Sequence, residues 1–146
     1  MNPLRRLLLG SGRFPADLRA ELQAERARVL EEGLAGSITY RGYRAPGRRY
    51  SFRKVAVNGA IAITERRLVA RVGRGQEVDL PLDDPRLGAI GATLDAPDRL
   101  CLGFDAGAFR DDRSGTVELR FTTAQAGRVV ELLGVRRSDR ERTIGT

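Results

Sequence analysis

The sequence contains no histidine and, among its 146 residues, a single cysteine, Cys101. Without histidine, the chain lacks the usual general base near neutral pH and the commonest metal ligand. One cysteine excludes an internal disulfide and any metal site built from several cysteines. Cys101 lies between two leucines in a strand pattern, which indicates a structural thiol. We therefore expect a chain that is not an enzyme and that carries no cofactor or metal.

Long apolar segments are also missing. The longest purely apolar runs, such as residues 7–9 and 60–63, span a few residues, whereas a membrane-crossing helix needs about 20. Arg5 and Arg6 followed by three leucines imitate a secretory signal, but the apolar stretch is shorter than the roughly 7 to 15 residues required. The sequence predicts a cytoplasmic protein, with a peripheral position at the inner face of the membrane as an extension of that prediction.

Lysine is nearly absent, since 25 of the 26 basic residues are arginine. The net charge of +7 is concentrated in residues 36–74, where ten basic residues face Glu65 alone. The positive electrostatic potential of this segment favours an anionic partner: a lipid headgroup, a nucleic acid or an acidic protein. A GC-rich genome produces the same arginine excess without selection for binding, so both interpretations stay open.

The spacing of apolar residues predicts a mainly β, single-domain chain. A helix is expected from Pro15 to Glu32, with Gly33 as its stop. Period-two alternation then predicts seven strands: 38–41, 50–64, 68–72, 78–82, 87–94, 100–104 and 117–121. Pro81 indicates an edge strand or its end, and Gly59 a sharp bend.

The last predicted element is a helix after the seventh strand. Thr122 and Gln125 have the spacing of a capping box, and Gly134 ends the helix. Its apolar positions fall on one face, at Ala126, Val129, Val130 and Leu133. This face must pack into the open end of the sheet, because an isolated helix of this length is marginal in water. We therefore expect an N-terminal arm and helix at 1–35, a β-domain at 36–134 and a disordered basic tail at 135–146.

Two segments carry a family resemblance. The hairpin sequence Ala60-Ile-Ala-Ile-Thr-Glu-Arg-Arg-Leu-Val-Ala70 resembles that of bacterial pleckstrin-homology-like (PH-like) and GRAM-like proteins. The ending, residues 117–133, is similar to their last strand and helix. The resemblance spans residues 36–134 and implies a seven-stranded antiparallel sandwich or barrel capped by a C-terminal helix. Unlike many eukaryotic PH domains, the chain has no tryptophan in that helix.

This fold implies a binding site at the end opposite the helix, framed by loops 44–52, 73–75 and 106–114. Converging guanidinium groups suit phosphate or carboxylate. The candidate anion- or lipid-binding residues are Arg41, Arg44, Arg48, Arg49, Arg53, Lys54 and Arg74. Asp111 and Asp112 offset Arg110 and Arg113 in the third loop. The alternative interpretation is a solvated loop carrying ordinary surface arginines.

Two functions remain open. The first is a non-enzymatic interaction or scaffold module that binds a protein partner, through an exposed sheet edge, or associates with itself. The second is peripheral binding to anionic membrane through the basic segment 41–54. Tyrosines interleaved with the arginines would also suit single-stranded nucleic acid, but at strand spacing they indicate packing, so nucleic acid is not the expected partner. No small-molecule substrate is inferred.

Overall fold

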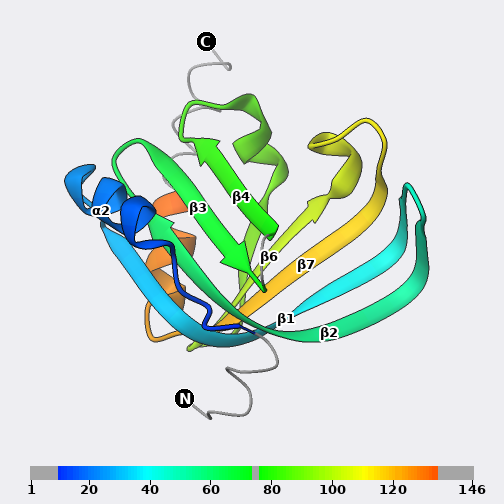
Figure 1. Ribbon diagram of the computed structural model, residues 1–146, viewed down its shortest axis with the longest axis horizontal. Helices are drawn as coiled ribbons and strands as arrows, with labels where there is room; N and C mark the ends of the chain where they lie inside the picture. Colours follow the sequence, from blue (N-terminus) through cyan, green and yellow to red (C-terminus); the bar gives the residue numbers. More distant parts are fainter. Residues whose placement is uncertain (1–9, 74–75, 135–146) are drawn as a thin grey trace.

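Seven antiparallel strands form one curled sheet in the computed structural model, which describes residues 10–73 and 76–134 (Figure 1). This confirms the predicted fold class. The strands are β1 (Val29–Ala45), β2 (Arg48–Ile63), β3 (Arg67–Val72), β4 (Gln76–Pro81), β5 (Gly91–Ala96), β6 (Arg99–Asp105) and β7 (Ser114–Thr122). The helices are α2 (Ala16–Ala24), a C-terminal helix whose described part is 126–134, and the short 3-10 turns η1 (Pro85–Ala89) and η2 (Ala106–Ala108).

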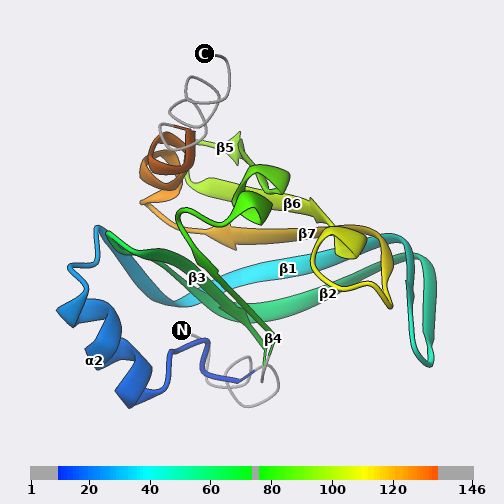
Figure 2. The same cartoon turned by 90° about the horizontal axis from the view of Figure 1, so that it is seen from above.

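The strand order β4-β3-β2-β1-β7-β6-β5 is a meander in which β1 joins the first four strands to the last three. The sheet bends into a half-barrel whose two edges are β4 and β5 (Figure 2). Glycines allow the close contacts inside this bend. A Cβ at Gly59 would overlap the Phe121 ring, and one at Gly36 would overlap the carbonyl oxygen of Arg120. The predicted bend at Gly59 therefore has a packing cause.

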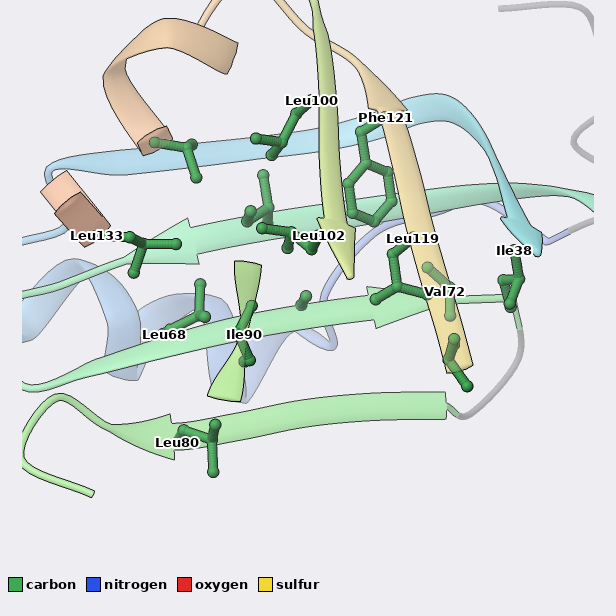
Figure 3. Packing of buried hydrophobic residues seen from close by; sticks show 14 of the residues in the cluster. Ile38, Leu68, Val72, Leu80, Ile90, Leu100, Leu102, Leu119, Phe121 and Leu133 are labelled. Atoms are coloured by element: carbon green, nitrogen blue, oxygen red, sulfur yellow. The ribbon is translucent and has the colours of Figure 1, made fainter. Parts of the chain in front are cut away.

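The main core lies on the concave face and is closed at one end by the C-terminal helix (Figure 3). Ala126, Val129 and Leu133 are buried there and Val130 is partly buried, as the apolar spacing predicted. Thr122 is not the cap, because it is the last residue of β7. Thr123 takes that role, since its Oγ1 accepts a hydrogen bond of 3.1 Å from the amide of Gln125.

The predicted helix over residues 15–32 is wrong beyond Ala24. Chain reversal follows at Arg26, which has a positive φ of 61°, and β1 begins at Val29. Its first residues pair with the end of β2, with Val29 opposite Ile63. Gly33 ends no helix; it lies at a bulge in β1 with φ of 67°. Pairing with β2 overrides the helical propensity of this stretch.

The N-terminal segment covers the convex face of the sheet (Figures 1 and 2). Phe14 and Leu22 are buried in a second, smaller core against Ala60, Ala62 and Val69. These small side chains alternate with the larger ones that face the main core. Both faces of β2 and β3 are therefore covered near this end of the sheet.

Two predicted boundaries differ from the structure. Residues 44–52 do not form a loop, because β1 continues to Ala45 and β2 starts at Arg48, leaving a tight turn at 46–47. The predicted strand over 87–94 begins at Gly91, after η1. Asp84 caps η1 by accepting a hydrogen bond from the amide of Arg86, so the sequence signal there belongs to a turn.

Some predictions fall outside the described residues: the first nine residues of the N-terminal arm, Arg74 and the tail at 135–146. Within residues 10–73 and 76–134, no helix combines the length and the apolar character that crossing a bilayer requires.

Candidate functional site

The basic segment 41–54, hereafter the basic hairpin, is a two-stranded ribbon at the end of the molecule opposite the C-terminal helix (Figures 1 and 2). β1 and β2 pair continuously to Ala45 and Arg48, and Gly47 with φ of 73° makes the turn. On the β2 side, β3 pairs only from Gly59 onward, so residues 48–58 form an edge. The hairpin therefore presents its side chains beyond the closed core.

Six basic residues and no acidic residue occur in the hairpin. All six are exposed: Arg41, Arg44, Arg48, Arg49, Arg53 and Lys54. Arg41 forms an ion pair, with its Nε 2.7 Å from Oε1 of Glu118. The other five have no ion pair within the described parts of the chain. The structure thus brings together six of the seven predicted candidates, the seventh being Arg74.

Phe52 is the exception to the expected packing of the hairpin aromatics, because 59% of its surface is exposed. It pairs with Arg41 across the two strands, and the guanidinium carbon of Arg41 lies 5.2 Å from its ring centroid. Lys54, two residues further along β2, lies on the same face. An exposed aromatic ring flanked by cations results.

The tyrosines pack together, as their strand spacing indicated. The rings of Tyr40 and Tyr43 are buried, with centroids 4.8 Å apart, and Tyr50 stacks 6.1 Å from Tyr43. Gly42, with φ of 55°, lies where the register of β1 against β7 shifts. The three rings thus pack against one another at the base of the hairpin.

A half-open cavity of about 760 Å³ lies on the concave face, beside the base of the hairpin. Apolar side chains of β3, β4, β6 and β7 form part of its walls, including Val72, Leu80, Phe104 and Leu119, and polar atoms contribute the larger share of the lining. The cavity exists because the C-terminal helix fills the other end of the half-barrel, whereas small residues such as Ala45, Ala70 and Ala106 line this one.

Charged side chains also line this cavity: Arg48, Arg86, Arg110, Arg113, Asp79 and Asp112. Four of them are held by neighbours. Oδ2 of Asp79 lies 2.9 Å from Nη1 of Arg67, and Nη2 of Arg86 lies 2.8 Å from Oδ2 of Asp84. Asp112 and Arg113 pair with each other, with Oδ1 3.8 Å from Nε. Arg48 and Arg110 have no ion pair in the part of the chain that the structure describes.

One buried donor of a lining residue lacks a hydrogen-bond acceptor. Arg113 Nη1 donates to the hydroxyl of Tyr43 at 3.2 Å, but its buried Nε has no hydrogen-bond partner. Ser37 Oγ is the other such atom within residues 10–73 and 76–134. Oδ1 of Asp112 lies 3.8 Å from Nε of Arg113, which is within ion-pair range and too long for a hydrogen bond.

Sequence reasoning placed a site at this end but missed the cavity and three of its residues. Arg86 follows a turn signal and gave no indication of facing the site. Arg110 and Arg113 were discounted because of the adjacent Asp111 and Asp112, yet only Asp112 is near either guanidinium, at 3.8 Å from Arg113. Sequence adjacency is a poor measure of charge neutralisation in a loop.

Two further residues, the predicted structural thiol Cys101 and Glu118, have plain structural roles. Cys101 is buried in β6, and burial raises the pKa of its thiol, which makes it a weak nucleophile. Glu118 is half-buried between two arginines, and the hydrogen bond from Arg41 lowers the pKa of its carboxyl group. In the described ranges no group of three potential ligands could hold a metal ion.

Comparison with known proteins adds no relative: no protein-family model, no curated protein and no solved structure matches this chain.

Proposed function

We propose that the chain is a binding module of the PH-like kind that attaches peripherally to anionic membranes through the basic hairpin. The observation that carries this proposal is the exposed Phe52 ring on a hairpin with six exposed basic side chains, five of which have no ion pair in the described residues. A soluble surface with no anionic partner has little reason to combine a large apolar group with this much unneutralised charge.

The physical argument has an electrostatic and an apolar component. Each basic residue near an anionic leaflet contributes about 1 kcal/mol of attraction, which falls off within a Debye length. An aromatic ring beside those charges can bury itself at the headgroup boundary. Arg41 and Lys54 share a face with Phe52, so both components act in the same orientation.

The PH-like assignment rests on topology together with the resemblance in residues 60–70 and 117–133. The meander order, the long β1 that joins both halves of the sheet, and the helix that closes one end support it. The open end of the half-barrel, where the hairpin lies, is then the binding end.

Vesicle sedimentation tests membrane binding. We expect the protein to co-sediment with vesicles containing phosphatidylserine, to dissociate as salt is raised, and to ignore phosphatidylcholine vesicles. Arg48→Gln with Arg49→Gln should weaken binding roughly thirtyfold, from about 2 kcal/mol for two charges. Phe52→Ala should also weaken vesicle binding, most clearly at high salt, where salt screens the electrostatic attraction and the apolar component dominates.

Matched controls separate the hairpin from net charge and from exposed apolar surface. Arg99→Gln with Arg128→Gln removes the same charge from other exposed surfaces, and Leu94→Ala removes an exposed apolar side chain from β5. Both should bind as the parent does. Equal loss in the controls and the hairpin variants, or no binding to acidic vesicles at low salt, would refute the proposal.

Association with a protein or with a second copy is the competing candidate, and one observation favours it. β5 is an edge of the half-barrel, and Leu94 on it is 43% exposed. An open edge can accept an added strand. Light scattering should then give a mass above one chain that Leu94→Lys reduces to a monomer; a monomer at all concentrations would count against self-association.

A further inference from the structure

We infer that the cavity on the concave face binds a small amphipathic anion: a single-chain carboxylate whose apolar body enters the half-barrel and whose head meets the arginines at its mouth. This inference concerns the interior of the half-barrel, and because Arg48 belongs both to the cavity lining and to the basic hairpin, its test uses Arg110, which lies outside the hairpin.

The apolar component follows from the walls. Val72, Val78, Leu80, Phe104 and Leu119 line a volume of about 760 Å³, within the range of small-molecule sites, roughly 300 to 1,000 Å³. Polar atoms make up the larger share of the lining, so only part of a fitting ligand can be apolar. An alkyl body would remove apolar surface from water on both partners.

The charged component follows from the unpaired donors. Arg48 and Arg110 line the cavity without an ion pair in the described residues, and both side chains are exposed. A carboxylate offers several acceptor positions that guanidinium groups match well. Because ion pairs already occupy Asp79 and Asp112, the remaining local charge is positive, which disfavours a cationic or neutral head.

Calorimetric titration with octanoate, decanoate and 1-decanol tests both components. We expect decanoate to bind about fifteenfold more tightly than octanoate, since each buried methylene contributes roughly a factor of four. Decanol should bind at least about tenfold more weakly than decanoate, the loss expected without a charged hydrogen-bonding head.

Two variants locate the bound chain. Arg110→Gln should lower decanoate affinity about tenfold and leave decanol affinity unchanged. Arg110 lies outside the basic hairpin, so vesicle binding should also stay unchanged, which separates this proposal from the preceding one. Arg49→Gln is the matched control, because Arg49 is exposed and does not line the cavity. Val78→Phe, which adds volume to the cavity on an edge strand, should abolish binding of both ligands.

Methyl NMR gives a readout that does not depend on the variants folding well. Decanoate should shift the signals of Val72, Leu80 and Leu119, and leave Leu94, outside the half-barrel core, unperturbed. Absence of binding at every chain length would overturn the inference. So would equal affinity for decanoate and decanol, undiminished decanoate affinity in Arg110→Gln, or shifts confined to residues outside the cavity.

Discussion

At the residue scale, Gly59 has the most sharply defined requirement. A Cβ there would meet the Phe121 ring and the carbonyl oxygen of Arg71, neither of which can move without disturbing the sheet or the core. We expect Gly59→Ala to lower the free energy of unfolding by about 1 to 3 kcal/mol through overpacking. Urea denaturation of the purified protein measures this.

Gly127 provides the matched control for that substitution. It lies in the C-terminal helix, and a Cβ built on it meets nothing within 4 Å. Gly127→Ala should therefore stabilise the protein by up to about 1 kcal/mol, because alanine loses less backbone entropy in a helix than glycine. If the two alanines had the same effect, close packing at Gly59 would not be the cause.

Single residues were predicted well where local chemistry decides their role. Proline 81 ends an edge strand, and Cys101 is a buried thiol, as their patterns indicated. Phe52 shows the limit, because the same alternation that buries Tyr40 leaves this ring exposed on the hairpin. Exposure depends on whether another layer covers that face, and the local sequence contains no information about that.

At the element scale, the sequence signals located every strand but not every boundary. The stretch 25–32 has helix-forming composition and yet enters β1, because it pairs with the end of β2 thirty residues later. The run 44–52 contains proline, glycine and charge, which suggested a loop, although only 46–47 forms the turn. In both cases strand pairing decided the outcome, with a partner distant in the sequence for 29–31 and a neighbouring strand across a tight turn for 44–52.

The candidate site was likewise predictable only where the local sequence decides it. Its basic residues could be named from the sequence, since six of them occur in one segment with no acid. The cavity could not, because it is assembled from six strands, η1 and the 106–113 segment. Its shape depends on how far the sheet curls and on which end the C-terminal helix fills.

At the scale of the whole molecule, the sheet carries a separate layer on each face, and Glu32 ties the outer layer to β1. Its carboxylate accepts two hydrogen bonds from Arg19, at 2.7 and 2.8 Å, and one from the amide of Phe14 at 2.8 Å. The side-chain hydrogen bonding from Arg19 is the main cause that lowers the pKa of Glu32. Phe14 and Leu22 then pack on the convex face.

This arrangement predicts a pH-dependent contribution to stability. Because the folded-state pKa of Glu32 lies below its unfolded value of about 4.3, its contribution is fully present above that pH. It is lost as the pH falls through the folded-state pKa and Glu32 becomes protonated. Glu32→Gln should therefore lower the free energy of unfolding at pH 7, and the difference from the parent should shrink below pH of about 4.

Urea denaturation at pH 7 and pH 3 measures the difference, and limited proteolysis at Arg19 reports whether the outer layer detaches. Glu131→Gln is the control, since Glu131 is exposed on the C-terminal helix and pairs with Arg128 three residues away. It should change stability little at either pH. A difference between Glu32→Gln and the parent that stays constant from pH 7 to pH 3 would show that the ionised carboxylate does not hold the outer layer. The contact of Phe14 and Leu22 with the sheet would then have to hold that layer by burial alone.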